Sequence, residues 1–145
     1  MKFAKIRDVK SPCRGHANDA GIDFFVPNDF EASALAPHES INIPSGIKVS
    51  IPAGHALIAF NKSGVAVKKG LDVGASVIDE SYQGELHLHL TNTTNKYISI
   101  APGEKIVQFI LLPINYEMPE EVSEDSLFEE KSERGEGGFG STGVE

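Results

Sequence analysis

The sequence has little cysteine and no long apolar stretch, and each absence excludes a class of protein. Cys13 is the single cysteine among 145 residues, so no disulfide can form within the chain. Stabilising disulfides belong mostly to oxidising compartments, so this composition favours a reducing cytosol. No run approaches the roughly 18 apolar residues that a membrane span requires, and no apolar signal core follows residues 1–5. We therefore expect a cytoplasmic protein, cellular or viral, with no membrane partner.

The sequence also lacks an excess of basic residues, and its acidic residues are concentrated in one segment. The net charge is −8. Residues 1–116 balance 11 Lys and Arg against 11 Asp and Glu, whereas residues 117–133 carry eight acidic residues and one base, Lys131. Proteins that bind nucleic-acid polymers normally present a basic surface. We therefore expect no nucleic-acid polymer among the partners.

Hydrophobic periodicity predicts short strands over the first 116 residues. In residues 85–91 three leucines alternate with polar residues, and period two places those leucines on one face of a strand. Residues 41–51 alternate in the same way on both sides of a Pro-Ser-Gly turn. Only Ser63–Lys69 could form a short helix. These patterns predict an all-β sandwich, jelly roll or barrel. Further candidate strands are residues 3–9, 21–26, 56–61, 71–79, 97–100 and 105–112.

The composition changes along the chain and predicts three parts of a single domain. Residues 1–116 form the β core, residues 117–133 an acidic connecting segment, and residues 134–145 a glycine-rich end. Five of the ten residues from Arg134 to Gly143 are glycine, and glycine loses the most conformational entropy on ordering. Such a segment is either a linker or a lid that becomes ordered over a ligand.

Two segments have the composition of a phosphate site, and each has a simpler structural explanation. The glycine-rich end is not a P-loop, because Ser141 stands where that motif needs lysine. Its arginine, hydroxyls and unhindered backbone N–H groups nevertheless suit phosphate, unless it is only a linker. Residues 61–66 open the short helix with Ser63 as a candidate N-cap, and form either an anion site or a capped turn.

Two further features concern carboxylate and imidazole groups. Residues 76–84 place Asp79 at the end of an apolar run, either facing a cleft or in an ordinary hairpin turn. His87 and His89 share one face of a strand. A metal site would need further ligands at suitable spacing, so a solvated sheet face is the better interpretation of this pair.

Five short motifs occur in a fixed order along nearly the whole chain. They are Asp19-Ala20-Gly21-Ile22-Asp23, Lys62-Ser63-Gly64-Val65-Ala66, the segment from Ser76 to Gly84, Pro102-Gly103-Glu104-Lys105-Ile106-Val107-Gln108, and the segment from Arg134 to Gly143. In this order they resemble the homotrimeric dUTP diphosphatases (dUTPases). The resemblance implies a distorted β jelly roll with a flexible C-terminal arm. It also implies a homotrimer with shared active sites, and hydrolysis of dUTP to dUMP and pyrophosphate.

The resemblance implies a role for each motif around the nucleoside. Asp79 would be the general base, which activates a water for attack on the α-phosphorus. Tyr82 would pack beneath the deoxyribose and exclude a 2′-hydroxyl. Backbone groups near Ser76 and Val77, and at residues 86–87, would read the edge of uracil. Phe139 would stack on the base.

The resemblance also implies how the triphosphate is held. Gln108 would contact both a phosphate and the attacking water, and Asp23 would support the second motif from behind. Mg²⁺ would be bound by phosphate oxygens and water, without protein side-chain ligands, and would neutralise charge together with the cationic donors. The remaining substrate-binding residues would be Lys62, Ser63, Gly64, Arg134, Gly140, Ser141 and Thr142.

Three positions depart from the family pattern. Lys62 stands where arginine is usual, which replaces a bidentate donor by a point charge and should weaken phosphate positioning. Ser76 stands where glycine is usual, and it would be strained if the backbone there needed a positive φ. Ser81 stands where an acidic residue is common, with no consequence that we can assign.

Several alternative functions compete with dUTP hydrolysis. One is a relative on the same fold, either a dCTP deaminase-like enzyme or a hydrolase of a modified dUTP. A second is a non-enzymatic, protein-binding regulator that uses the acidic segment 117–133 as its contact surface. A third is a jelly-roll sugar-binding or shell protein, which would explain the strands but not the glycine-rich end.

Overall fold

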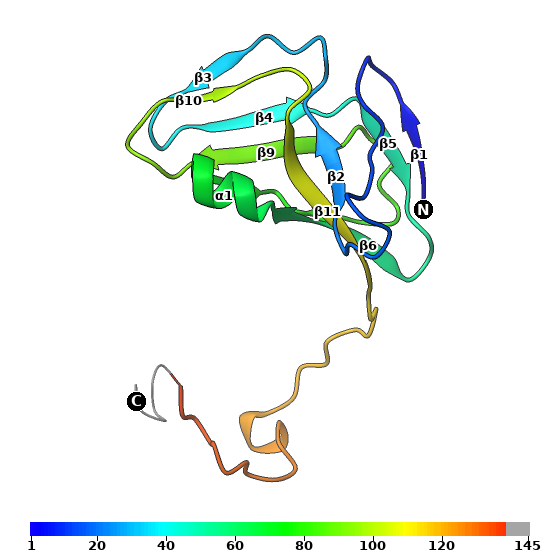
Figure 1. Ribbon diagram of the computed structural model, residues 1–145. Helices are drawn as coiled ribbons and strands as arrows, with labels where there is room; N and C mark the ends of the chain where they lie inside the picture. Colours follow the sequence, from blue (N-terminus) through cyan, green and yellow to red (C-terminus); the bar gives the residue numbers. More distant parts are fainter. Residues whose placement is uncertain (139–145) are drawn as a thin grey trace. The chain divides into compact units, whose positions relative to one another are not determined.

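The computed structural model describes residues 1–138, which are mainly β-strands with a short α-helix (Figure 1). The all-β class predicted from the sequence is confirmed. The chain divides into a unit Met1–Asn115 and a second unit that begins at Tyr116. No helix among the described residues is long and apolar enough to cross a membrane. The elements of the first unit are β1 (Lys2–Lys5), β2 (Ile22–Phe25), β3 (Ser33–Leu35), β4 (Ser40–Pro44), β5 (Ile47–Ser50), β6 (His55–Asn61), α1 (Ser63–Lys69), β7 (Leu71–Gly74), β8 (Val77–Ile78), β9 (His87–Asn92), β10 (Ile98–Ile100) and β11 (Lys105–Pro113).

The strands of the first unit pair antiparallel in small sheets. One sheet has the order β2-β11-β6-β8, another has β4-β9-β7, and β1-β5 and β10-β3 form two-stranded pairs. The chain changes sheets between β4 and β5, although the sequence places only a Pro-Ser-Gly turn there. Gly46 adopts φ +74° at this corner, and the Ser45 N–H donates to the Leu86 carbonyl at 2.9 Å. Corners of this kind let two sheets enclose one core.

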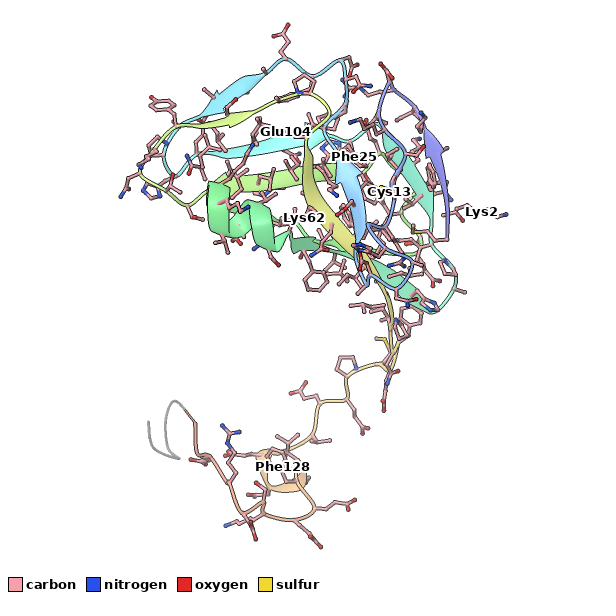
Figure 2. All side chains as sticks on the ribbon, in the orientation of Figure 1. Lys2, Cys13, Phe25, Lys62, Glu104 and Phe128 are labelled. Atoms are coloured by element: carbon pink, nitrogen blue, oxygen red, sulfur yellow. The ribbon has the colours of Figure 1, made fainter. Side chains whose placement is uncertain are left out.

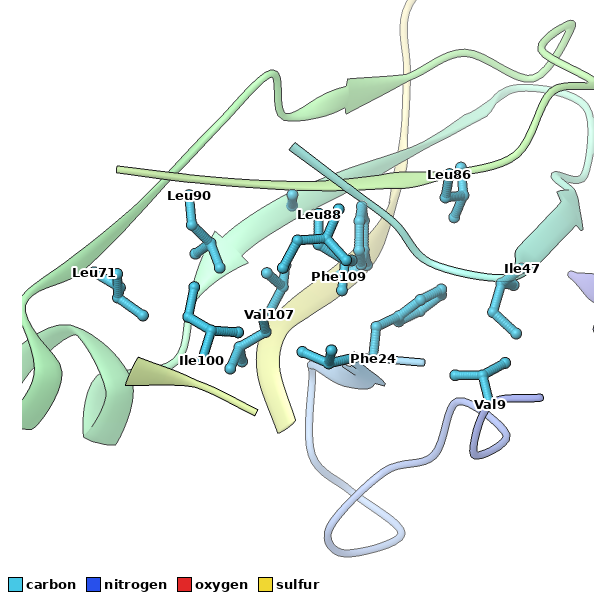
Figure 3. Close-up of a cluster of buried hydrophobic side chains, with 14 of the residues drawn as sticks. Val9, Phe24, Ile47, Leu71, Leu86, Leu88, Leu90, Ile100, Val107 and Phe109 are labelled. Carbon is cyan, nitrogen blue, oxygen red and sulfur yellow. The ribbon is translucent and has the colours of Figure 1, made fainter. Parts of the chain in front are cut away.

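The core lies between the inner faces of the two larger sheets (Figure 3). Phe24 and Phe109, from the paired strands β2 and β11, have ring centroids 4.6 Å apart. From the opposite sheet, Leu88 and Leu90 of β9 are fully buried. These two leucines belong to the alternating pattern of residues 85–91, so the expected inward face is the observed one. Burial of such side chains is the main favourable contribution to stability.

Helix α1 has the bounds predicted from the sequence, Ser63–Lys69, and its end has a clear local cause. Gly70 adopts φ +66°, and its N–H donates to the Ala66 carbonyl at 3.0 Å. Glycine accepts this left-handed conformation without steric penalty. Lys68 and Lys69 lie in the last turn, where cations interact favourably with the helix dipole.

Several expected strands have different limits in the structure. Residues 71–79 form two strands, β7 and β8, because Ala75 turns the backbone with φ +49°. The strand expected at residues 3–9 ends at Lys5, after which the Ile6 N–H donates to the Gly46 carbonyl. β3 was not expected, since its three residues give too little alternation to detect.

The second unit contains one short regular element in its described part, the 3₁₀ turn η1 (Glu124–Ser126). The Ser123 and Ser126 hydroxyls lie 2.7 Å apart, and the Leu127 N–H donates to the Glu124 carbonyl. Leu127 and Phe128 are both exposed; Phe128 is labelled in Figure 2. The turn therefore depends on local hydrogen bonds and not on burial.

Asn92 is a buried polar residue that joins three segments at the end of β9. Its Nδ2 donates to the carbonyls of Leu35, Ala36 and Lys96 at 3.2, 2.9 and 2.7 Å. Its Oδ1 accepts from the N–H and hydroxyl of Thr94 at 2.9 and 2.8 Å. The side chain therefore satisfies backbone groups that burial would otherwise leave unpaired.

We predict that Asn92→Ala lowers the free energy of unfolding by about 3 kcal/mol, because several buried polar groups lose their partners together. Urea denaturation followed by circular dichroism measures the change. Asn95→Ala is the matched control, since that side chain is exposed and its Oδ1 lies 3.0 Å from His38 Nε2. Equal losses in the free energy of unfolding for the two substitutions would contradict a stabilising role of the Asn92 hydrogen bonds.

Candidate active site

Asp23 is the centre of the first group of polar residues. It lies on β2 and is 4% exposed, although alternation along the strand would allow it to face water. Its Oδ1 binds the Lys62 ammonium, and its Oδ2 binds the Lys105 ammonium at 2.9 Å. Lys62 immediately precedes α1, where Figure 2 labels it, and Lys105 begins β11. One carboxylate therefore joins the first, second and fourth motifs.

The charges around Asp23 outweigh the effect of its burial. Desolvation alone would raise the pKa of this carboxyl. The hydrogen bonds and charges of Lys62 and Lys105 act in the opposite direction, and they hold the pKa of Asp23 below its usual value. In return, the hydrogen bond and charge of Asp23 raise the pKa of Lys105. The group is therefore an ion pair at neutral pH, with the carboxylate ionised.

Gln108 lies beside Asp23 on the neighbouring strand. The two residues are register partners in the β2–β11 pair, so their side chains share one face of the sheet. The Gln108 Nε2 donates to the Asn61 carbonyl at 2.8 Å. Asn61 ends β6 and directly precedes Lys62, so Gln108 is held next to the second motif.

The start of α1 differs from the sequence-based expectation. Ser63 was expected to be the N-cap, but Lys62 occupies the cap position, and no side chain caps the first turn. The prediction was wrong because Lys62, with φ −81° and ψ 122°, is the last extended residue before the helix begins. Ser63 and Gly64 are exposed, and a Cβ at Gly64 would have no neighbour within 4 Å. Their backbone N–H groups can therefore approach an anion closely.

The third motif lines a separate cavity of about 260 Å³. Its wall includes Val77, Asp79, Tyr82 and His87, and the other lining residues are Asn42, Ala75, Ile78, Glu85 and Leu86. Asp79 follows β8 and is exposed, and its carbonyl accepts from the Tyr82 N–H at 3.1 Å. Asp79 and Tyr82 thus belong to one turn that lines the cavity.

Tyr82 is fixed by its surroundings, although 44% of its surface is exposed. Its hydroxyl donates to the Glu85 carbonyl at 2.9 Å. The ring crosses Gly84, where an added Cβ would overlap the Tyr82 hydroxyl and lie 2.9 Å from Cε2. The Glu85 carboxylate accepts from the Gly46 N–H at 2.7 Å and ties this turn to the β4–β5 corner.

The positive backbone torsion in the third motif falls on Ala75 and not on Ser76. Ala75 has φ +49°, whereas Ser76 is absent from the residues with positive φ in the described part of the chain. The Ser76 carbonyl accepts from the Ala59 N–H at 2.8 Å, which joins this residue to β6. The strain considered for Ser76 therefore does not arise.

The structure gathers the expected site residues into two groups within the first unit. Asp23 and Lys62 form a salt bridge at the start of α1, next to Ser63 and Gly64. Gln108, the register partner of Asp23, bonds the Asn61 carbonyl beside them. Ser76 adjoins the cavity wall formed by the third motif, but none of the first group lines that cavity. Arg134 lies in the second unit, where its Nε donates to the Gly137 carbonyl at 2.7 Å. Phe139, Gly140, Ser141 and Thr142 lie outside the described residues.

Two residues in these groups were not singled out from the sequence. Lys105 pairs with Asp23, and Asn61 supports Gln108 through its carbonyl. Both contacts join residues far apart in the chain, so spacing gives no signal for them. His87 bonds Asn42 at 2.9 Å. Residues 1–138 contain no group of three or more residues that could ligate a metal.

Comparisons with known proteins identify the family of the chain. The chain matches the dUTPase family over residues 7–143. It is 36% identical over 144 residues to the mouse deoxyuridine 5′-triphosphate nucleotidohydrolase, covering 99% of this chain and 85% of the mouse protein. It is 37% identical over 134 residues to the Candida albicans protein of the same name, covering 92% and 81%.

Solved structures show the same fold. The dUTPase of Staphylococcus bacteriophage 80alpha, in a mutant form with dUpNHpp, superposes with a TM-score of 0.84 at 30% identity, over 99% of this chain and 98% of that one. A mutant dUTPase from phage phi11 of S. aureus, described with a structural Mg(II) ion, gives a TM-score of 0.74 at 25% identity, over 85% and 96%. The fold and its polar groups define a β jelly-roll enzyme of nucleotide metabolism. This chain belongs to the dUTPase family.

We predict that Asp23→Asn lowers the free energy of unfolding by about 2 kcal/mol at pH 7, because two ammonium groups lose a buried partner. Because the pKa of Asp23 is lower in the native state, its ionised carboxylate stabilises the fold at pH values above the unfolded pKa of about 3.9. This stabilisation disappears as the pH falls through the native pKa. The difference between parent and variant should therefore shrink below about pH 4. Urea denaturation at several pH values measures it.

Asp29→Asn is the matched control for this experiment. Asp29 pairs with Arg7 at 3.0 Å, but half of its side chain is exposed. Pairs at such positions contribute less than about 1 kcal/mol. A difference between parent and Asp23→Asn that stays constant from pH 7 to pH 3 would contradict the assigned ionisation of Asp23.

Proposed function

We propose that this chain hydrolyses dUTP to dUMP and pyrophosphate. The observation that carries the proposal is the third-motif cavity, which both Asp79 and Tyr82 line. Its volume of about 260 Å³ lies below the roughly 300–1,000 Å³ of sites for whole drug-sized ligands. It suits a base and its sugar, so the triphosphate must be held by residues outside it. Membership of the dUTPase family supports uracil as the base.

Within this cavity each residue has a proposed task. Asp79 takes a proton from the water that attacks the α-phosphorus. The ring of Tyr82 lies beneath the deoxyribose. Its hydroxyl donates to the Glu85 carbonyl, and this hydrogen bond keeps the ring in place. Backbone groups of Ser76, Val77 and residues 86–87 bond the uracil edge. A wall of backbone rejects cytosine, because its amino group would leave a buried donor mispaired.

The triphosphate is bound by the first group of polar residues, called the Asp23 group from here on: Asp23, Lys62, Ser63, Gly64, Lys105 and Gln108. The N–H groups of Ser63 and Gly64 and the amide of Gln108 contact the α- and β-phosphates. Lys62 contributes positive charge, and its salt bridge to Asp23 fixes the position of its ammonium group. Because lysine gives a point charge where arginine gives a planar fork, phosphate positioning at Lys62 is looser than in relatives with arginine.

The glycine-rich end completes the site as a lid. We assign residues 1–116 as the catalytic core, residues 117–133 as the connection and residues 134–145 as the lid. Arg134 has five N–H donors, of which the structure uses Nε for the Gly137 carbonyl. In the closed state, Arg134 would bind the γ-phosphate with Ser141 and Thr142, Gly140 would let the backbone approach, and Phe139 would stack on the base.

Mg²⁺ is the proposed cofactor, carried by the substrate. The first group offers two lysines and a carboxylate that they already neutralise, which suits phosphate and does not suit a cation. The metal would therefore be held by phosphate oxygens and water, where it reduces the negative charge that develops on the phosphates. The residues of the chain then bind and orient the nucleotide around it.

We propose a homotrimer in which different copies contribute the two groups of site residues. The cavity of the third motif has no lysine or arginine among its lining residues. None of Asp23, Lys62 and Gln108 lines that cavity. A second copy that presents its Asp23 group to the cavity would complete the site, and the lid could come from a third. The protein would act in the cytoplasm, cellular or viral.

The alternative functions fit the described residues less well than dUTP hydrolysis does. A dCTP deaminase-like activity needs further polar groups that activate water at the base, whereas Glu85 is already bonded to the Gly46 N–H. A hydrolase of a modified dUTP keeps the same mechanism and differs only at the cavity wall. A regulator without activity would not need Asp79, Tyr82 and Gln108 together.

We predict that the protein with Mg²⁺ converts dUTP, but not dCTP, dTTP, UTP or dATP, to monophosphate and pyrophosphate. Asp79→Asn should lower kcat by about 10²- to 10⁴-fold, because general-base catalysis typically contributes that much. Chromatography of the nucleotides and a pyrophosphate assay measure both results. Asp29→Asn, which alters an exposed aspartate that pairs with Arg7, is the matched control. Folded protein that leaves dUTP intact would contradict the proposed function.

A further inference from the structure

The carboxamide of Gln108 is held in one orientation by the groups on its two sides. A carbonyl oxygen accepts hydrogen bonds and cannot donate them, so the amide nitrogen must face the Asn61 carbonyl, 2.8 Å away. The amide oxygen, Oε1, therefore turns to the opposite side, toward Gly21. It is this oxygen that can accept a hydrogen bond from a water.

Gly21 leaves the space that this orientation needs. A Cβ at residue 21 would overlap Oε1 of Gln108 and lie 2.8 Å from its Cδ. Gly21 is not among the residues with positive φ in the described part of the chain, so its backbone is accessible to any residue. Residue 21 must therefore be glycine to leave space beside Gln108, and not because its backbone torsion requires glycine.

Asn61 is anchored independently of Gln108. Its Nδ2 donates to the Asp72 carboxylate at 2.6 Å, and its Oδ1 accepts from the Val73 N–H at 2.8 Å. These two bonds tie the end of β6 to β7. The Asn61 carbonyl thereby becomes a fixed acceptor for Gln108, and the side chain of Asn61 has a clear function although it is exposed.

We propose that Gly21 and Asn61 are positioning residues for Gln108. Gly21 admits the carboxamide and Asn61 fixes its nitrogen, so that Oε1 can accept a hydrogen bond from one O–H of the attacking water. Asp79 takes the proton of the other O–H, and the oxygen bonds to the α-phosphorus as pyrophosphate leaves. This inference rests on the proposed dUTP hydrolysis. Neither residue touches the substrate; both act through the position of one amide oxygen.

The test is a double-mutant cycle in dUTP hydrolysis with Gly21→Ala, Gln108→Ala and the combined variant. We expect Gly21→Ala to lower kcat by about 10- to 100-fold with KM changed by less than about 3-fold, because a small misplacement of a catalytic group mainly raises the barrier. The combined variant should be no slower than Gln108→Ala alone, since the group that Gly21 positions is then absent.

Asn61→Ala gives a second measurement and leaves the backbone carbonyl in place. We expect a fall in kcat that is smaller than for Gly21→Ala, and that also disappears in the Gln108→Ala background. Asn95→Ala, which removes an exposed amide bonded to His38, is the matched control and should keep the parent kcat. Thermal unfolding of each variant checks that the fold is retained.

The outcomes separate this inference from the proposed function. If the parent does not hydrolyse dUTP, the proposed function fails, and the inference that rests on it fails as well. If the parent is active but Gly21→Ala matches it, the inference alone is wrong. Effects of Gly21→Ala and Gln108→Ala that multiply in the combined variant would also overturn it, because the two residues would then act separately.

Discussion

The buried carboxylate of Asp23 is the interaction on which the arrangement of the site depends. A charge at 4% exposure is unfavourable by itself, and it is tolerated here because two ammonium groups bind its two oxygens. Those ammonium groups stand at the start of α1 and at the start of β11. The same contact therefore stabilises the fold and sets the positions of the groups proposed to bind phosphate.

The residues expected to form the site lie in two groups, and none of the first group lines the third-motif cavity. We propose that base and sugar occupy this cavity, where Asp79 and Tyr82 share a turn. Phosphate is proposed to bind where α1 begins, next to Gln108 and the sheet of β2, β11 and β6. This division is our reason for proposing assembly, because a second copy could present its Asp23 group to the cavity of the first.

Local patterns predicted the elements, and long-range contacts had to come from the structure. The alternation in residues 85–91 gave the inward face of β9, and composition gave the bounds of Ser63–Lys69. The break at Ala75 was missed because the left-handed backbone there falls on a residue without turn propensity. Lys105 and Asn92 were missed for another reason, since their partners lie far along the chain or are backbone carbonyls. The motif order predicted the family, but not which motifs touch.

The most direct test of a divided site is to mix two inactive chains. Asp79→Asn lacks the proposed base, and Gln108→Ala lacks the proposed amide on the phosphate side. When the two are unfolded and refolded together, some assemblies will combine an intact Asp79 from one chain with an intact Gln108 from another. We expect the mixture to hydrolyse dUTP much faster than the sum of the separate variants. Mixed oligomers that gain no activity, or an active monomer, would contradict the account.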